Sequence, residues 1–449
     1  MIFLVFNSER ALLREDRGRW MQVSVPKEFV NTDIVCGFYR EDFLEWRKQK
    51  VTFFELGRFF DPYEVNEEDV KEFVELCIEH GILDPYSGRI NTIGYARKKV
   101  LEALSPILST EETPQENAGF YGGRTEFYRQ KAEGHIVYYD INSAYGWAMS
   151  QPLPDRNRER VYRGLSYEDI LELSEKFFIL FSGEVYQDRD LPVCPVKIKE
   201  EEEIFYPRGK LSGVWTNYEL SLLQPEEVLK IDTVWAYPYS SFSLREVVED
   251  FYSQREKSLA HKVFYKWQIV LLYGMVGWKQ KGFLKSRLIG AYITARTRKE
   301  LYEKLIMAQE YGNLLYCDTD SFFLLASPEN HKKLQELLPV RQGLGGWGIR
   351  REVNSLEVYG FKRYVCRMNN EYFVAMSGER IDHIDEHGRF YRRNFYTGQI
   401  FRVEISEQEL PKRKLTEEGH TVPWSIEELH ALAKQETQKT VKKARVKLR

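Results

Sequence analysis

The feature that most constrains this chain is the segment YCDTDS at Tyr316–Ser321, in which two aspartates stand between two apolar runs. The runs Leu314–Cys317 and Phe322–Leu325 are typical of short buried strands, so we expect a hairpin with the intervening residues as its turn. Alternation along an extended chain would point Asp318 and Asp320 to the same side. Two carboxylates beside buried strands are costly without a cation, which favours a divalent metal. A polar hairpin tip without a ligand is the alternative interpretation.

The length of 449 residues is enough for two or three domains or for one multilobed enzyme. Hydrophobic residues make up 43% of the chain and aromatic residues 14%, which is typical of a folded protein. No run of about twenty apolar residues exists, so we expect no membrane span. The start has neither a cationic leader nor a cleavage site, and the five cysteines form no CxxC pair. These features favour the cytoplasm and argue against a zinc site or a disulfide framework.

The net charge of −3 conceals a strong charge asymmetry along the chain. Residues 61–120 contain 13 acids against 5 Lys and Arg, whereas residues 255–299 contain 11 Lys and Arg against one acid, Glu256. Residues 439–449 add six basic residues and no acid. Because local charge governs phosphate binding, the basic middle of the chain and the basic tail predict a nucleic-acid path.

Hydrophobic periodicity predicts the order of elements. Short apolar strands alternate with charged turns in residues 1–60, and a helix is expected over residues 66–80 with Gly81 as its stop. Residues 109–118 are polar and contain Pro114, which makes them the best candidate for a linker. Beyond them we expect strands at 135–139, 178–186 and 228–237, helices at about 245–275 and 290–310, and an end that is first helical and then basic.

Two strand segments carry polar residues suited to catalysis or binding. In VYYDINSAYGWAM (Val137–Met149), Asp140 ends an apolar strand, a place where metals and phosphates are commonly bound. A helix cap is the more common use of such an aspartate. In FKRYVC (Phe361–Cys366), Lys362 and Tyr364 would alternate onto one face of a strand, which suits contact with a phosphodiester backbone or a primer end.

One predicted helix, HKVFYKWQIVLLYG at His261–Gly274, has a basic face. Lys262 and Lys266 are four residues apart, and Tyr273 lies further along the same stripe. Two cations on one stripe suit a triphosphate, with the aromatic ring positioned to touch a base. A solvated basic face is the alternative interpretation.

These segments, in this order, resemble the family B DNA polymerases, above all the protein-primed branch of linear-genome phages and related mobile elements. Motif A of that family reads Asp-x-x-Ser-Leu-Tyr-Pro. Asp140, Ser143 and Tyr145 match it, whereas Ala144 and Gly146 depart from it.

Motif B of the family reads Lys-x-x-x-Asn-Ser-x-Tyr-Gly. Lys266, Tyr273 and Gly274 match it, whereas Val270 and Leu271 replace the Asn-Ser pair. The apolar residue at position 270 removes an amide that would face the nascent base pair. The resemblance therefore implies low fidelity or tolerance of lesions.

The remaining motifs are complete or nearly so. Motif C, Tyr-x-Asp-Thr-Asp-Ser, is met in full at Tyr316–Ser321, and the Lys-x-Tyr motif is met by Lys362 and Tyr364. A loop of the family linked to template binding, Tyr-x-Gly-Gly, is loosely similar to FYGGR through Gly122 and Gly123.

The resemblance covers about residues 119–375 and implies an α+β fold. This fold is a right-hand polymerase with an antiparallel palm sheet, helical fingers and a small thumb, behind a truncated exonuclease-like N-terminal region. The implied divisions are the N-terminal remnant 1–108, the linker and loop 109–124, the first palm part 125–240, the fingers 241–300, the second palm part 301–375, and the thumb with the basic tail 376–449.

The resemblance also predicts that proofreading is missing. The family's exonuclease needs an Asp-x-Glu triplet, and the first 118 residues contain none. Where its last acidic motif reads Tyr-x-x-x-Asp, this chain has Lys71 and Glu75. We therefore expect a catalytically dead remnant.

By resemblance, the chain is a DNA-directed DNA polymerase that uses two Mg²⁺ ions, which Mn²⁺ could replace. The implied catalytic residues are Asp140, Asp318 and Asp320, and the implied metal ligands are these three and Ile141. The implied nucleotide-binding residues are Ile141, Tyr145, Arg255, Lys262, Lys266 and Tyr273. The implied contacts with DNA or primer are Gly122, Gly123, Arg124, Thr319, Lys362 and Tyr364.

The expected partners are primer-template DNA and dNTPs, with a terminal protein or a processivity factor as further candidates. A viral or mobile-element origin in the cytoplasm of a host cell fits this set. Two other functions stay open: a primase-polymerase that starts without a primer or from a protein hydroxyl, and a catalytically silent DNA-binding subunit. The three intact aspartates argue against the silent subunit.

Overall fold

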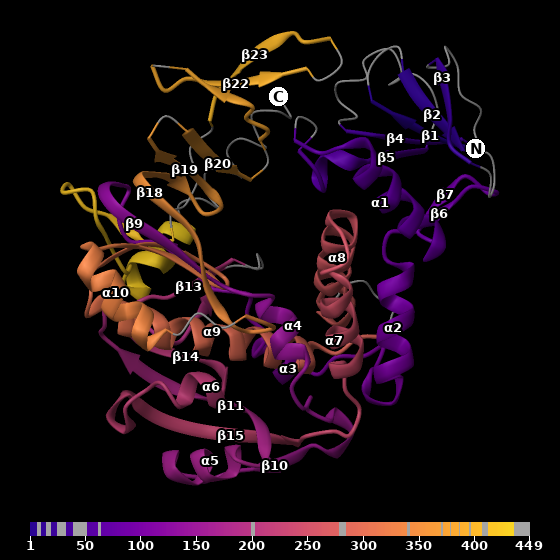
Figure 1. Ribbon diagram of the computed structural model, residues 1–449. Coiled ribbons are helices and arrows are strands. Elements are labelled where there is room, and N and C mark those ends of the chain that lie inside the picture. The colour runs from indigo at the N-terminus through magenta and orange to yellow at the C-terminus, as the bar shows by residue number, and fades with distance from the viewer. Residues whose placement is uncertain are drawn as a thin grey trace, which may run out of the picture. The chain divides into compact units, whose positions relative to one another are not determined.

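The computed structural model describes residues 1–6, 10–14, 19–24, 33–38, 52–61, 64–198, 203–277, 284–338, 342–369, 371–377, 379–385, 387–394, 397–405 and 412–434 (Figure 1). The chain divides into two compact units, each assembled from separate stretches. Unit 1 contains residues 1–102, 246–275 and 378–406, and unit 2 contains residues 103–245, 276–377 and 407–449. None of the helices among the described residues is long and apolar enough to cross a membrane.

Unit 1 is built on a five-stranded mixed sheet with the strand order β3-β2-β1-β4-β5. Its strands are β1 (Ile2–Val5), β2 (Arg10–Arg14), β3 (Met21–Ser24), β4 (Ile34–Gly37) and β5 (Thr52–Glu55). β1 pairs antiparallel with β2 and parallel with β4. All residues of β1 and β4 are buried, as expected for apolar central strands covered on both faces. The short apolar strands expected in residues 1–60 are thus confirmed.

Helices cover this sheet and extend the unit. They are α1 (Glu67–Glu79), α2 (Gly94–Leu104, which belongs to unit 1 as far as Glu102), α7 (Arg245–Gln254, from its second residue) and α8 (Leu259–Gly277, as far as Met275). α1 confirms the predicted helix 66–80. The single helix predicted over 245–275 is wrong, because α7 ends at Gln254 and α8 starts only at Leu259. The Ser258 hydroxyl accepts the His261 backbone N–H at 3.2 Å and so supplies a start for α8.

Aromatic contacts join α8 to α1 and α2 within unit 1. The Phe73 ring on α1 lies 6.1 Å from that of Phe264 on α8, and the Tyr95 ring on α2 lies 6.3 Å from the same ring. Figure 1 accordingly shows α8 beside α2. The unit also contains the small sheets β6 (Leu83–Asp84) with β7 (Arg89–Ile90) and β21 (His383–Ile384) with β22 (Phe390–Arg393) and β23 (Ile400–Val403).

Unit 2 is built on a seven-stranded sheet with the strand order β20-β19-β18-β9-β17-β16-β8. Every neighbouring pair in it is antiparallel. Its strands are β8 (Thr125–Phe127), β9 (Lys131–Ile141), β16 (Asn313–Asp318), β17 (Ser321–Leu325), β18 (Trp347–Gly360), β19 (Arg363–Met368) and β20 (Glu371–Met376). The predicted strand 135–139 and the predicted hairpin around Asp318 are therefore confirmed.

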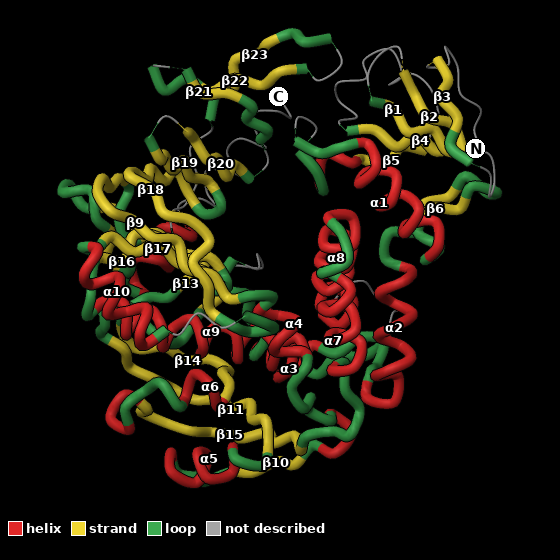
Figure 2. Tube along the Cα trace, viewed as in Figure 1, coloured by secondary structure: helices red, strands yellow, loops and turns green. Residues whose placement is uncertain are grey.

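A second antiparallel sheet, β10-β15-β11-β14, lies beyond the long helix α9 (Arg287–Gln309), which Figures 1 and 2 show between the two sheets. Its strands are β10 (Arg160–Tyr162), β11 (Phe177–Gln187), β14 (Gly209–Thr216) and β15 (Val228–Pro238). The main core contains Tyr139 and Phe322 from the large sheet, Leu301 from α9 and Trp215 from the second sheet. The remaining named elements are α3 (Pro114–Ala118), α4 (Ala144–Met149), α5 (Tyr167–Ser174), α6 (Asn217–Leu220), α10 (Pro328–Leu337), β12 (Val196–Lys197), β13 (Ile204–Phe205), β24 (Lys414–Leu415) and β25 (Thr421–Val422).

The predicted linker 109–118 is an ordered part of unit 2. Its last residues form α3, where Thr113 and Glu116 make a reciprocal capping box and Pro114 takes the first helical turn. Glu112 forms ion pairs with Lys285 at 3.0 Å and with Arg287 at 3.2 Å. Polar composition predicted a linker, but the same polar side chains are used here for capping and buried pairing.

Candidate active site

A row of polar residues crosses one face of the seven-stranded sheet near the ends of its central strands. Asp318 is the register partner of Thr125 on one side and of Ser321 on the other. Ser321 is in turn opposite Asp140, which is opposite Gly348. Directly opposed residues of an antiparallel pair point to the same face, so Asp318 and Asp140 flank Ser321 on that face. The Thr125 hydroxyl donates to Asp318 Oδ1 at 3.0 Å.

Asp320 reaches this row through a tight turn. Thr319 has a left-handed φ of 59°, and its backbone N–H donates to the Arg124 carbonyl at 2.6 Å. The expected alternation of Asp318 and Asp320 along an extended chain is therefore wrong, because the chain reverses between them. The Asp320 carbonyl accepts the N–H of Ile141 at 2.8 Å, which holds the turn beside the strand that carries Asp140.

Asp140 and Asp318 both act electrostatically on Asp320. Burial raises the pKa of Asp320 to about 7, and the negative charges of Asp140 and Asp318 add to that rise. Two cations oppose it: Arg350 Nη1 lies 2.8 Å from Asp140 Oδ2, and Lys362 Nζ lies 3.3 Å from Asp318 Oδ1. Two of the three acids are thus each in a direct ion pair with a cation.

The residues present fit a divalent cation of the Mg²⁺ type. In the described part of the chain, no three His, Cys, Asp or Glu side chains are arranged closely enough to form a metal site as they stand. Arg350 and Lys362 hold Asp140 and Asp318, respectively. The donors are nevertheless carboxylate oxygens, which Mg²⁺ prefers, and the raised pKa of Asp320 indicates that its charge is under-compensated.

Lys362 and Tyr364 lie next to the row, but not as an alternating strand pair. Lys362 has a φ of 56° and belongs to the turn before β19, so its placement in a strand is wrong. Its backbone N–H donates to the Tyr316 hydroxyl at 2.8 Å. The Tyr364 ring lies 5.3 Å from the rings of both Tyr316 and Phe323. Both predicted residues therefore contact the hairpin that carries the aspartates.

The loop containing Gly122 and Gly123 packs against the turn that follows Asp318. A Cβ added at Gly123 would lie 2.8 Å from the Thr319 side chain, so only glycine fits there without a shift. Arg298 Nη1 donates to the carbonyl oxygens of Tyr121 at 2.7 Å and Gly122 at 2.8 Å. The predicted template loop and motif C are therefore one packed assembly.

Arg124 does not fit its predicted contact with DNA, because it is 1% exposed. Its guanidinium pairs with buried Glu126 at 2.5 Å, donates to the Pro192 carbonyl at 2.8 Å and lies over the Tyr206 ring. The second arginine on Glu126 is Arg413, at 3.5 Å. The role of this side chain is to hold β8 and hence the Thr319 turn.

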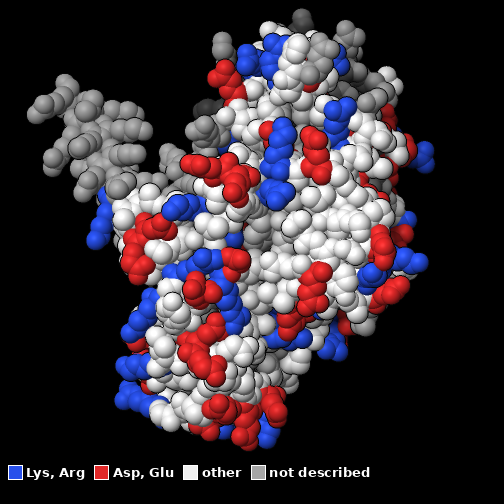
Figure 3. Space-filling model, turned by 90° about the vertical axis from the view of Figure 1, so that its left-hand side faces the viewer, with Lys and Arg blue, Asp and Glu red and all other residues white. Residues whose placement is uncertain are grey.

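Several basic side chains of residues 255–299, the segment predicted to follow a nucleic acid, are buried inside the protein. Lys285, Arg287 and Arg298 are buried and paired with carboxylates, the first two with Glu112 and the third with Glu219. On the face drawn in Figure 3, basic and acidic side chains are interspersed. A run of cations in the sequence therefore overestimates the cations available to a phosphate backbone.

The predicted nucleotide-binding residues fall in both units. Arg255, Lys262, Lys266 and Tyr273 belong to unit 1, where Lys262 and Lys266 are exposed on α8 and the Arg255 guanidinium lies over the Tyr252 ring. Their meeting with the carboxylates of unit 2 stays a prediction. Ile141 and half-buried Tyr145 belong to unit 2. Since the Ile141 side chain is 1% exposed, only its backbone is available to a ligand.

Three site residues were missed by the sequence argument. Arg350 and Thr125 bind Asp140 and Asp318, respectively, across neighbouring strands. Lys412 lies near Asp318, where burial lowers the pKa of its amine against the attraction of the acids. Thr125 directly follows the glycine loop, which was a usable signal. No sequence signal pointed to Arg350 or Lys412. Their places depend on strand register and on where a distant part of the chain packs, and neither is a local property of the sequence.

Residues 91–281 match the family model described as DNA polymerase type B, organellar and viral. Solved structures share the fold of this chain. Phi29 DNA polymerase complexed with single-stranded DNA aligns with a TM-score of 0.52 at 15% identity, over 71% of this chain and 66% of that one. Its orthorhombic crystal form aligns with a TM-score of 0.54 at 13% identity, over 83% and 76%.

A third Phi29 structure, the ternary complex with primer-template DNA and incoming nucleotide substrates, aligns with a TM-score of 0.53 at 14% identity. It covers 76% of this chain and 72% of that one. The chain therefore spans about two thirds to three quarters of the Phi29 polymerase, down to 66% in the single-stranded DNA complex. No curated protein matches it in sequence. These alignments confirm the predicted mixed fold with its palm-like sheet.

Proposed function

We propose that this protein is a DNA-directed DNA polymerase that extends a primer 3′-hydroxyl along a template strand. The observation that carries the proposal is the gathering of Asp140, Asp318 and Asp320 at one end of paired palm strands. The family match supports it, as do the Phi29 complexes, whose partners are primer-template DNA and nucleotides.

Asp140 and Asp320, with Asp318 beside them and the Ile141 backbone within reach, are the residues that would hold Mg²⁺. When bound, two such ions would promote ionisation of the primer hydroxyl and offset charge on the triphosphate. Mn²⁺ is the expected substitute. The protein's own contribution is to fix the carboxylates: Thr125 and Lys362 hold Asp318, and Arg350 holds Asp140.

The other contacts of the substrates are distributed between the two units. Lys262 and Lys266 would bind triphosphate oxygens, with Tyr273 and Arg255 nearby on the same unit. Tyr145 would lie against the sugar and leave no room for a 2′-hydroxyl. Lys362, Tyr364 and Thr319 would steady the primer terminus, with Gly122 and Gly123 keeping the template loop close to them.

Primer extension on a DNA template with Asp320→Asn tests the proposal. Because the amide keeps the shape and removes the charge, we expect extension to fall at least about a hundredfold while binding of primer-template DNA persists. Glu357→Gln is the matched control, since Glu357 lies on the same sheet and pairs with Lys131 at 3.7 Å away from the row. Near wild-type extension by Asp320→Asn would refute the assignment of this site.

The chain would extend primers without proofreading. In unit 1, Lys71 forms ion pairs with Glu67 and Glu68 at 2.9 and 2.8 Å, and Glu75 pairs with Arg14 at 2.9 Å. The helix position at which the exonuclease needs an acid thus carries structural ion pairs. Incubation with a labelled mismatched primer and Mg²⁺ but no dNTPs should give no shortened products, whereas steady removal of 3′ nucleotides would contradict this part.

A terminal protein or a processivity factor, and the cytoplasm of a host cell, complete the proposed setting. A reaction with template and labelled dNTPs but no primer separates primed synthesis from unprimed initiation. We expect products only when a primer or a protein hydroxyl is supplied.

A further inference from the structure

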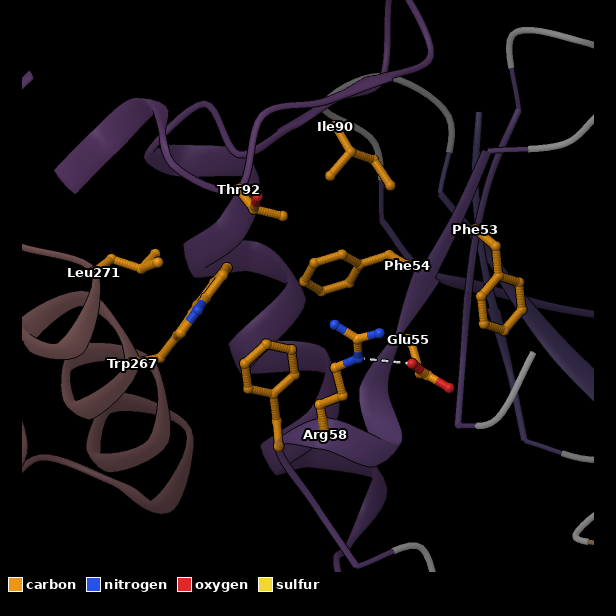
Figure 4. Close-up of a pocket in the computed structure, with 9 residues that line it drawn as sticks. Phe53, Phe54, Glu55, Arg58, Ile90, Thr92, Trp267 and Leu271 are labelled. Atoms are coloured by element: carbon orange, nitrogen blue, oxygen red, sulfur yellow. Dashed lines mark hydrogen bonds and ion pairs between the residues drawn. The ribbon is translucent and has the colours of Figure 1, made fainter. Parts of the chain in front are cut away.

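Unit 1 contains a pocket of about 560 Å³ that none of the catalytic assignments uses (Figure 4). Its walls come from β5 and the 3₁₀ turn Leu56–Arg58 after it, from the end of β7 and the residues that follow it, and from α8. Its volume lies within the range of about 300–1,000 Å³ that is usual for small-ligand sites. The lining residues are Phe53, Phe54, Glu55, Arg58, Phe59, Ile90, Thr92, Trp267 and Leu271.

Aromatic rings dominate the walls. The Phe59 and Trp267 ring centroids are 4.8 Å apart with 60° between the planes, and Phe54 stacks on Phe59 at 5.8 Å. Phe54 is buried, but Phe59 and Trp267 are only half-buried. In Figure 4, Phe54 and Trp267 point toward one another across the pocket. Such rings present flat apolar faces on which a planar group can stack.

Polar groups stand at the rim of the same pocket. Arg58 Nε donates to Glu55 Oε2 at 2.7 Å, and the Arg58 side chain is 77% exposed. Among the described residues, Glu55 is the one partner of this guanidinium, so its outer N–H groups face the pocket mouth or solvent. Thr92 adds an exposed hydroxyl. A cation above aromatic walls suits a ligand that joins a planar ring to a phosphate.

We propose that this pocket binds an unpaired nucleobase of single-stranded DNA, with the base against the free faces of the Trp267, Phe54 and Phe59 rings and Arg58 on an adjoining phosphate. Stacking on aromatic side chains beside cations is the general mode of single-strand binding without sequence preference. An apolar side chain of a partner protein would fill the walls but leave the charged rim without a match. The inference rests on the proposed function, because that function supplies an unpaired template strand.

The test compares two single-stranded oligonucleotides of about twelve residues, one of thymidines and one of abasic tetrahydrofuran units. Affinities are measured by fluorescence anisotropy in EDTA, so that binding does not depend on the metal site. The quantity of interest is the ratio of the two affinities, which isolates the bases from the phosphates. Trp267→Leu and Phe59→Leu remove a ring and keep an apolar side chain, and Tyr86→Leu, at an exposed aromatic outside the pocket, is the matched control.

We expect the base-to-abasic ratio to fall about tenfold in each pocket variant and to stay at its wild-type value in Tyr86→Leu. Arg58→Gln should instead weaken both oligonucleotides and lower the salt dependence by about one ion. A ratio that is unchanged in the folded pocket variants would overturn the proposal and leave a protein partner as the occupant to seek. Primer extension by the wild type, run in parallel, keeps the two claims apart: if extension succeeds and the ratio is unchanged, only the pocket assignment fails.

Discussion

The two units differ in how closely their acidic side chains are grouped. In unit 1, Asp33 lies 3.6 Å from the N-terminal amine, and Glu75 is shared by Arg14 at 2.9 Å and the Trp20 indole N–H at 2.8 Å. In unit 2, three aspartates lie together at one end of the sheet, and burial and the charges of Asp140 and Asp318 raise the pKa of Asp320. Acids that lie apart, each beside its own cation, contribute to structure, whereas grouped acids that raise one another's pKa are candidates for a ligand site.

The difference lies in what each site costs the protein. A paired carboxylate needs no further partner, and a pair at the surface changes the free energy of unfolding little. Gathering like charges destabilises the folded state unless a cation joins them. In the sheet of unit 2, grouped like charges occur at the end where the strands meet the Asp318 turn. Substitutions in the two units should therefore have different effects on primer extension and on stability.

The largest effect is expected from one neutral substitution in each sheet. Asp140→Asn removes a carboxylate from the row, so we expect primer extension to fall by about a thousandfold with little change in melting. Asp33→Asn removes a buried acid from the sheet of unit 1, and it should leave extension intact but lower stability by about 1–3 kcal/mol. Extension assays and calorimetry on both variants check this. Equal losses of extension would remove the distinction between the two sheets.

The second prediction concerns the ion pairs that support the row. Glu126 is buried and compensates both Arg124 and Arg413, so Glu126→Gln leaves two buried cations without their carboxylate. We expect the unfolding free energy of unit 2 to fall by about 3–5 kcal/mol. Denaturant titration measures this loss. Arg124→Met should cost less, because Glu126 keeps Arg413.

The surface pair of Lys210 with Glu184, at 2.8 Å, provides the control for these variants. Lys210→Met should change the unfolding free energy by less than about 1 kcal/mol. If the buried and the surface substitutions cost the same, the support attributed to Glu126 does not exist.

Much of this architecture was predictable from the sequence, for identifiable reasons. The strands around Asp318 and the strand that carries Asp140 contain apolar runs of strand length, and α1 has a clear apolar stripe between Asn66 and Gly81. These signals are local. The break before α8 and the helix inside the expected linker were also encoded, by Ser258 and by the capping box of Thr113, but composition outweighed them.

Other parts of the site were out of reach of a local argument. Arg350 meets Asp140 only because β18 pairs with β9 in one register, and a single sequence does not reveal that register. The reversal at Thr319 and the turn at Lys362 both use left-handed backbone at residues other than glycine, which a pattern of alternation does not anticipate. Burial of Arg124 has a similar cause, since the Pro192 carbonyl and the Tyr206 ring that cover its guanidinium come from distant parts of the chain.

A smaller effect is expected from adding one methyl group to the glycine loop beside the Asp318 turn. Gly123→Ala would press its Cβ against Thr319, whereas a Cβ at Gly122 has no atom within 4 Å. We expect Gly123→Ala to reduce extension about tenfold by displacing the Asp318 turn, and Gly122→Ala to have little effect. Thr319→Gly removes the side chain that the added Cβ would meet. Gly123→Ala should therefore slow extension less when it is introduced into Thr319→Gly than when it is introduced into the wild type. No difference between the two alanine variants would exclude this packing as a determinant of rate.

The smallest effect is expected in unit 1, where a substitution should change selectivity and leave the rate nearly unaltered. Val270 is an apolar residue that is 56% exposed on α8, on the helix that carries Lys262 and Lys266. An amide at this position would add a hydrogen-bonding group toward the nascent base pair, and a polar contact discriminates between bases better than an apolar surface does. Val270→Asn should therefore lower misincorporation about threefold on a defined template, while correct extension changes by less than about twofold. Val270→Leu, which changes shape without adding a hydrogen bond, is the matched control, and equal error rates in the wild type and Val270→Asn would rule out a role for this residue in base selection.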